Sequence, residues 1–163
     1  MPHSCTLERV EAAPLALRIE WRDGQLVRLN VCRANGEQTP TPSAGALAFK
    51  AALEDYVAGR KPRWPEPELD WSGVSPFARK ALEALKRHAT HGKTLTYGEL
   101  AGLAGSPGAA RAVGGAMAKN PFPLLYPCHR VLGAKGALTG FSAEGGTETK
   151  ALLLGIERGE PAC

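Results

Sequence analysis

One run of residues in this sequence is suited to covalent chemistry, Pro127-Cys128-His129-Arg130. A thiolate is the reactive form of cysteine, and a nearby positive charge or a base that removes the proton increases its population. His129 is placed to act as that base, and Arg130 adds a positive charge. On this run alone, a buried thiol beside a surface histidine is the more ordinary interpretation, so the rest of the chain must decide.

A third group should orient the imidazole, because the base in such a relay is itself held in place by another residue. Glu157 is the candidate, since it follows apolar residues of the last predicted helix, Leu152 to Leu154 and Ile156. We therefore predict a relay of Cys128, His129 and Glu157.

Four cysteines occur, at positions 5, 32, 128 and 163, and no two of them form a Cys-x-x-Cys pair. We expect reduced thiols and neither a metal nor a cofactor. A zinc site remains as an alternative, although the spacing does not call for one. Its ligands would be Cys5, Cys32 and one histidine from His3, His88 and His91.

Charge divides the 163 residues unevenly. Residues 1–71 hold 9 Lys/Arg and 10 Asp/Glu, a net of −1, whereas residues 72–163 hold 11 and 6, a net of +5. A basic C-terminal half favours a polyanionic partner such as nucleic acid. No stretch approaches the ~20 apolar residues of a membrane helix, and the N-terminus lacks the pattern of a secretion signal, so we expect a cytoplasmic protein.

The N-terminal part has the pattern of a small α/β unit. Strands are predicted over 15–21 and 26–31, joined by a hairpin at Asp23-Gly24, and a helix is predicted over 46–57. Three prolines within residues 60–71 predict an extended linker. We therefore expect an N-terminal α/β domain over 1–71, including that linker, and a second domain over 72–163.

The second domain is predicted to be mostly helical. One helix begins at Ser75-Pro76 and ends at Gly92, and a capping box at residues 96–99 opens a short helix through Leu103. A Gly-containing turn leads to another helix from Pro107 to about Lys119, which is a helix-turn-helix pattern. A loop or hairpin is predicted over 124–141 and a final helix over 148–156.

The helix after Pro107 carries almost no large side chains, because residues 109–118 are mostly alanine and glycine. A helix that reads bases in the major groove carries Arg, Asn or Gln instead. A thin helix suits close approach to a surface such as the minor groove, which is only ~6 Å wide. Tight helix–helix packing is the alternative explanation.

Several blocks together resemble the signature of the O6-alkylguanine-DNA alkyltransferases, the methylated-DNA–protein-cysteine methyltransferases. The blocks are Ala-Arg-Ala-Val-Gly-Gly-Ala-Met at 110–117, Asn120-Pro121, Pro-Cys-His-Arg-Val at 127–131, Thr96-Tyr97 and Gly140-Phe141-Ser142. The resemblance covers about residues 75–157, roughly half of the chain.

This resemblance implies a fold and an activity. The fold is α/β, with a ribonuclease-H-like N-terminal domain and a winged helix-turn-helix C-terminal domain. The activity is single-turnover DNA repair, in which an alkyl group moves irreversibly from O6-alkylguanine, or from O4-alkylthymine, to a cysteine of the protein. The partner is double-stranded DNA, bound through its minor groove by a monomer, and the damaged nucleotide is flipped out of the stack.

The resemblance also implies roles for the reacting residues. Cys128 would accept the alkyl group, His129 would act as its base through a water molecule, and Glu157 would complete the relay. Asn120 would join the cysteine loop to the helix-turn-helix. Tyr97 would crowd the 3′ phosphate and donate a hydrogen bond to the purine.

Further residues would bind DNA or the damaged base. Arg111 would fill the space that the flipped nucleotide leaves, with Ala110 and Gly114 beside it on the DNA-facing helix. The substrate pocket would be formed by Met117, Val131, Ser142 and Phe141.

The sequence departs from the family pattern at two places. Phe141 stands where many members carry tyrosine, and residues 143–146 form a segment about one residue longer than usual. Three other classes of protein fit this sequence less well than an alkyltransferase. A lesion-binding protein of the alkyltransferase-like kind would lack Cys128, a transcriptional regulator would need a base-reading helix, and a cysteine hydrolase would need an oxyanion hole.

Overall fold

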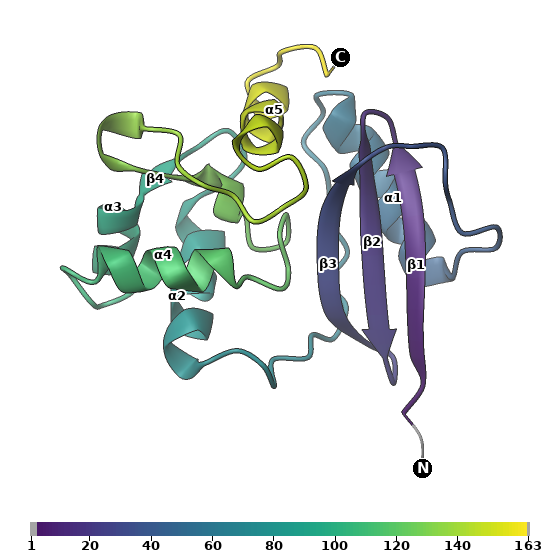
Figure 1. The fold of residues 1–163 in the computed structure, drawn as a ribbon, viewed down its shortest axis with the longest axis horizontal. Coiled ribbons are helices and arrows are strands. Elements are labelled where there is room, and N and C mark those ends of the chain that lie inside the picture. The colour runs from purple at the N-terminus through teal and green to yellow at the C-terminus, as the bar shows by residue number, and fades with distance from the viewer. Residues whose placement is uncertain (1–2, 163) are drawn as a thin grey trace.

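The computed structural model describes residues 3–162, so Cys163 lies outside the described residues. A three-stranded antiparallel sheet with one helix against it forms one side of the molecule, and a group of helices forms the other (Figure 1). The mixed α/β class predicted from the sequence is confirmed. Within residues 3–162, no helix has both the length and the apolar character that a membrane crossing requires.

The sheet is built from two consecutive hairpins. Its order is β1-β2-β3, and Asp23 and Gly24 both have positive φ at the tight β2–β3 turn, as a hairpin of this kind requires. The helix α1 packs against β1 and β2. The bounds are Cys5–Ala12 for β1, Leu15–Arg22 for β2, Gln25–Arg33 for β3 and Ala44–Val57 for α1.

The strand β1 is absent from the sequence prediction, and its composition explains why. A charged residue, Glu8, occupies one of its two buried positions, while Leu7 is 56% exposed. The Glu8 carboxylate accepts hydrogen bonds from Trp21 Nε1 and from both the backbone and the hydroxyl of Ser43, which compensates its burial. A polar residue at a buried position and an apolar residue at an exposed one obscure the usual alternation in this strand.

The segment predicted as a linker is extended but lies against the rest of the protein. The backbone of Leu26 pairs with this segment through two hydrogen bonds, one on each side of Leu69. Trp71 then meets Phe122 and Tyr126 edge-on, with both ring centroids 5.3 Å away. Aromatic contacts of this kind join the segment to the helical part of the molecule.

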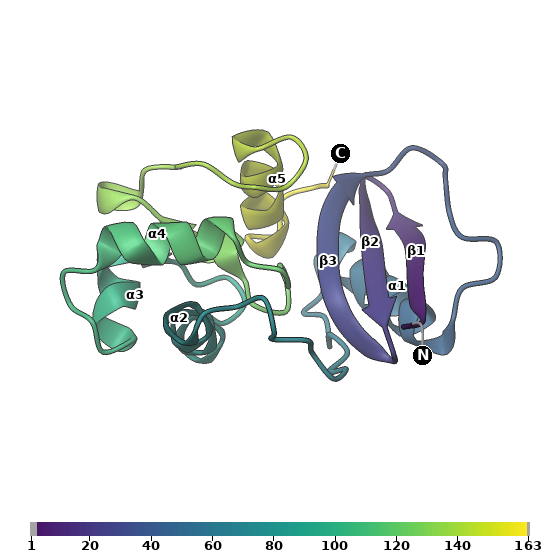
Figure 2. The ribbon, with the colours of Figure 1, turned by 60° about the horizontal axis from the view of Figure 1, so that its bottom comes forward.

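The helical part follows the predicted order. Ser75 caps α2 by accepting from Ala78 N, and Thr96 and Glu99 form the predicted capping box at the start of α3. The helices α2, α3 and α4 contact one another, as Figure 2 shows from a second side. The bounds are Pro76–His88 for α2, Leu95–Thr96 for β4, Tyr97–Leu103 for α3, Ala110–Ala118 for α4, Cys128–Arg130 for the 3-10 helix η1, Val131–Leu132 for β5, Ala134–Gly136 for η2 and Thr147–Glu157 for α5.

Two predicted helix boundaries are wrong, and one predicted loop region contains a strand. The helix α2 ends at His88, because Gly92 has positive φ and belongs to the turn after it. The helix α4 begins at Ala110, because Gly108 also has positive φ. The region predicted as a loop or hairpin contains β5, which pairs in parallel with β4 through Leu95↔Val131.

The small residues of α4 are only partly explained by packing. Val113, Ala116 and Met117 are buried, whereas Ala112 and Gly115 are exposed. The exposed face is therefore free to approach a partner closely.

Candidate active site

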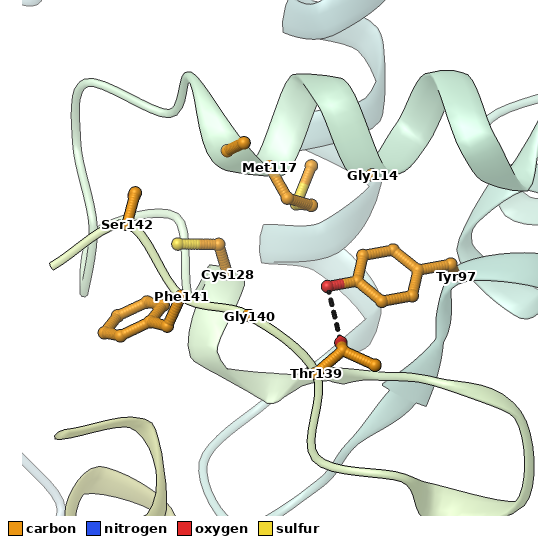
Figure 3. A pocket seen from close by; sticks show the side chains of 9 residues that line it. Tyr97, Gly114, Met117, Cys128, Thr139, Gly140, Phe141 and Ser142 are labelled. Atoms are coloured by element: carbon orange, nitrogen blue, oxygen red, sulfur yellow. Dashed lines mark hydrogen bonds between the residues drawn. The ribbon is translucent and has the colours of Figure 1, made fainter. Parts of the chain in front are cut away.

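The Cys128 thiol lies at a pocket of about 500 Å³ beneath α4 (Figure 3). The residue is only 4% exposed, and Figure 3 shows its side chain directed into the space below Met117. The pocket wall combines residues from α3, α4, η1 and the segment after η2. The lining residues are Tyr97, Gly114, Met117, Ala118, Cys128, Thr139, Gly140, Phe141 and Ser142.

Asn120 fixes the loop that carries the thiol. Its Nδ2 donates to Tyr126 O at 2.8 Å, and its Oδ1 accepts from Phe122 N at 2.9 Å. Cys128 N in turn donates to the same Tyr126 carbonyl at 2.7 Å. Asn120, just after α4, and Cys128 N thus donate to the same carbonyl group, that of Tyr126. Asn120 therefore lies between the two segments, which is the bridging position predicted for it.

The resting state of Cys128 differs from the sequence expectation. Burial raises the pKa of the thiol, while a hydrogen bond from Asn120 and the charge of Lys150 oppose that rise. Arg130 does not supply the positive charge predicted for it, because its guanidinium turns to Glu157 Oε1 and to Ala89 O, each at 2.7 Å. The thiol is therefore protonated at neutral pH and needs a base.

His129 and Glu157 form a fully enclosed pair. His129 is 0% exposed, and its Nε2 hydrogen-bonds to Glu157 Oε2. Burial lowers the pKa of His129, and Glu157 works in the opposite direction. With Nε2 protonated toward the carboxylate, Nδ1 carries the lone pair, and no described protein group hydrogen-bonds to it. The neutral imidazole can accept a proton at that nitrogen.

Four groups converge on the carboxylate of Glu157, whose side chain is 1% exposed. Besides His129, these are Arg130 Nε at 2.7 Å, Tyr56 Oη at 2.6 Å and Gly92 N at 3.2 Å. Burial alone would raise the pKa of Glu157, but the bonds from His129 and Arg130 hold it well below its ordinary value of 4.5. Glu157 is consequently an anion at neutral pH.

Lys150 is a residue of this site that sequence reasoning missed. It is 1% exposed, its Nζ donates to Thr139 O at 3.4 Å, and it lies 5.9 Å from the Tyr97 ring centroid. Burial lowers the pKa of Lys150, and the neighbouring Cys128 opposes that shift. A signal was present, because Lys150 precedes Glu157 by seven residues and so lies on the same face of α5.

The pocket contains most of the predicted wall but not all of it. Met117, Phe141 and Ser142 line it as predicted. Val131 does not line it, because this residue lies in β5 and pairs with β4. Gly114 was predicted on the DNA-facing surface but lines the pocket, where an added Cβ would meet the Tyr97 ring at 3.9 Å.

Tyr97 and the start of α4 occupy different places. The Tyr97 hydroxyl hydrogen-bonds to Thr139 Oγ1 at 3.1 Å within the pocket (Figure 3). Ala110 and Arg111 lie outside it in the first turn of α4, with Arg111 exposed. Ala118, Thr139 and Gly140 are further lining residues that the sequence did not indicate.

The described residues do not support the alternative of a zinc site. Within residues 3–162, no three His, Cys, Asp or Glu side chains are arranged to hold a metal ion. Cys5 is exposed and Cys32 is buried.

A family model described as "6-O-methylguanine DNA methyltransferase, DNA binding domain" matches residues 76–159. The chain belongs to this family. The resemblance found in the sequence is thereby confirmed. The constitutive methylated-DNA–protein-cysteine methyltransferase of Bacillus subtilis is 42% identical over 124 residues, which cover 76% of this chain and 72% of that protein.

Other relatives extend the similarity to the N-terminal part. The methylated-DNA–protein-cysteine methyltransferase of Mycolicibacterium paratuberculosis is 40% identical over 146 residues, covering 87% of this chain and 86% of the relative. The crystal structure of Mycobacterium tuberculosis OGT in complex with DNA has a TM-score of 0.74 at 34% identity, covering 94% of each chain. The alkyltransferase family therefore shares the whole arrangement and not only its C-terminal motifs.

Replacing Glu157 by glutamine should lower the free energy of unfolding at pH 7 by about 3–5 kcal/mol, because buried Arg130 loses its counter-charge. Urea denaturation measures this. The matched control is Glu148→Gln on the exposed first turn of α5, which should change stability by about 0.5 kcal/mol or less.

The difference between the wild type and Glu157→Gln should also depend on pH. The folded-state pKa of Glu157 is depressed, so its stabilisation is present above about pH 4.5 and is lost as the pH falls toward the folded-state pKa. A difference that stays constant from pH 7 to pH 3 would contradict this origin.

Proposed function

We propose that this protein repairs DNA by moving an alkyl group from O6 of guanine to Cys128 Sγ and retaining it. The observation that carries the proposal is the buried thiol of Cys128 in a pocket, backed by the enclosed His129–Glu157 pair. Membership of the 6-O-methylguanine DNA methyltransferase family supports the same chemistry. Relatives named methylated-DNA–protein-cysteine methyltransferases point to the same class of substrate.

The first step is removal of the thiol proton. It passes to Nδ1 of His129 through a water molecule, and Glu157 stabilises the imidazolium that forms. The thiolate is then the anion that Lys150 compensates inside the protein. This division of charge lets a thiol with a raised pKa react at neutral pH.

The second step exchanges two bonds at the alkyl carbon. A bond from Cys128 Sγ to that carbon forms as the carbon–O6 bond breaks, and the electron pair stays on the purine. The Tyr97 hydroxyl leaves Thr139 and donates a proton to the purine, and the proton held by His129 makes good that loss through solvent. The net change is that the alkyl group replaces the thiol hydrogen and guanine is restored.

The product is a thioether, which explains why the protein would act once. A thioether is not displaced by water under ordinary conditions, and Cys128 is the only thiol among the lining residues of the pocket. The protein is thus consumed in the reaction. The same exchange at O4 of an alkylated thymine makes that base a second substrate.

Access to Cys128 requires the damaged nucleotide to leave the base stack, because the thiol is 4% exposed. Extrusion costs a few kcal/mol, and insertion of Arg111 into the gap offsets part of that cost. The small residues on the exposed face of α4 suit approach to the minor groove of double-stranded DNA. Ala110, at the start of that face, would lie against the DNA backbone.

The architecture fits DNA repair if the chain is divided into two domains, with the boundary between residues 71 and 72. We assign the sheet with α1 to a ribonuclease-H-like domain and residues 72–163 to a winged helix-turn-helix domain, acting as a monomer. The presence of Cys128 speaks against a protein that only binds the lesion. Helix α4 consists mostly of alanine and glycine, which argues against a transcriptional regulator that reads bases.

Incubation with a duplex that carries one O6-methylguanine should add the mass of one methyl group to the protein, mapped to Cys128. The yield should not exceed one methyl group per protein molecule. Cys128→Ser should abolish the gain, whereas the matched control Cys5→Ser, an exposed thiol outside the pocket, should retain it. A methyl group on another residue would contradict the proposal, and a duplex with O4-methylthymine tests the second substrate in the same way.

Arg111→Ala should slow alkyl transfer from the duplex about tenfold to a hundredfold, since each ~1.4 kcal/mol lost from extrusion is a factor of ten. Transfer from free O6-methylguanine base needs no extrusion and should keep its rate, as single-turnover assays can show. Arg87→Ala, an exposed cation of α2, is the control for lost charge. An equal loss on the free base would rule out the role of Arg111 in filling the gap.

A further inference from the structure

A small polar cleft opens beside the alkyl pocket, between β3 and the C-terminal end of α4. Its volume is about 120 Å³, and it shares Ala118, Phe141 and Ser142 with the wall of the pocket. Figure 1 shows the end of α4 facing β3 across this place. A hydrogen bond of 2.8 Å from Leu29 N to Pro121 O fixes the two sides of the cleft relative to each other.

Two cations face this cleft from opposite sides, Arg28 on β3 and Lys119 directly after α4. Both are exposed, and neither has an ion pair or a side-chain hydrogen bond within residues 3–162. Glu20 is the cross-strand neighbour of Arg28, yet the two side chains form no ion pair in the described structure. Several other arginines are paired with acids, namely Arg9, Arg22, Arg60, Arg79, Arg130 and Arg158.

The remaining polar groups of the cleft are also able to donate. Asn30 and Ser142, whose side chains are hydrogen-bond donors, line the cleft, and its lining residues include no Asp or Glu. Asn120 contributes little, because both ends of its amide are already bonded within the cysteine loop. A site with two cations, further donors and no carboxylate favours an anion.

The size of the cleft restricts which anion fits. Pockets for whole small molecules measure about 300–1,000 Å³, so a cleft of 120 Å³ accommodates one small group such as a phosphate. Since the cleft and the alkyl pocket share a wall, a strand whose base enters the pocket brings its own phosphates to this place. The wall shared with the alkyl pocket gives no comparable argument for binding of a free nucleotide at this cleft.

We propose that Arg28 and Lys119 bind a phosphodiester of the DNA strand that presents the damaged base. The inference rests on the proposed function and extends it, because it gives the N-terminal sheet a direct part in DNA binding. The N-terminal 71 residues carry a net charge of −1. The contribution of the N-terminal sheet to DNA binding therefore comes from the single residue Arg28 and not from a generally basic surface.

The test is the salt dependence of binding to a duplex that carries one O6-methylguanine, measured in the Cys128→Ser background so that no methyl group is transferred, since each phosphate contact adds about 0.9 to the slope of log K against log salt. Arg28→Ala and Lys119→Ala should each reduce the slope, and the double variant should reduce it by about 0.9 in all, the contribution of one phosphate. Arg28→Lys keeps the charge and should keep the slope. The matched control Arg63→Ala removes an exposed cation outside the cleft and should also leave the slope unchanged.

Three outcomes would overturn the inference. Unchanged slopes in both alanine variants would show that no phosphate is bound there. An equal reduction in Arg63→Ala would show an effect of net charge alone, and an equal reduction in Arg28→Lys would show a structural effect. Because these outcomes are read from binding by a variant without the acceptor thiol, they are separate from the mass gain on Cys128 of the wild-type protein, which tests the proposed function.

Discussion

The buried carboxylate of Glu157 is the group on which the site depends. It accepts hydrogen bonds from His129, Arg130, Tyr56 and Gly92, and so joins η1, α1 and the turn after α2 to the end of α5. Burial of an anion is unfavourable unless the anion is paired and hydrogen-bonded. Here the partners of the carboxylate come from three different parts of the chain. The orientation of the imidazole therefore depends on contacts between segments that are distant in the sequence.

The chemistry of Cys128 follows from the same enclosure. Burial raises the pKa of its thiol and lowers that of His129, so both groups are neutral at rest. In the proposed relay, proton transfer between them would create two charges together, each beside a fixed partner, Glu157 for the imidazolium and Lys150 for the thiolate. The Cys128 thiol is thus protonated at rest, which suits a residue that would be used once.

The sequence was most informative where the signal is local. The caps at Ser75 and Thr96, the hairpin at Asp23-Gly24 and the adjacent Cys128-His129 follow from short-range rules, and the structure contains them. What was missed depends on contacts between distant segments. These are the burial of Glu8 in β1, the position of Arg130, the pairing of β5 with β4, and the contact of Lys150 with Thr139.

The pH dependence of single-turnover alkyl transfer is the most direct test of the enclosed relay. In the proposed relay neutral His129 is the base, and its pKa lies below the ordinary 6.5, so the rate should fall about tenfold per pH unit only below pH 6.5. Above pH 6.5 the rate should be nearly constant, although the pKa of the Cys128 thiol lies above 9.0. A rate that instead rises about tenfold per unit from pH 6.5 to pH 9 would show that the thiol ionises without His129, and would contradict the relay.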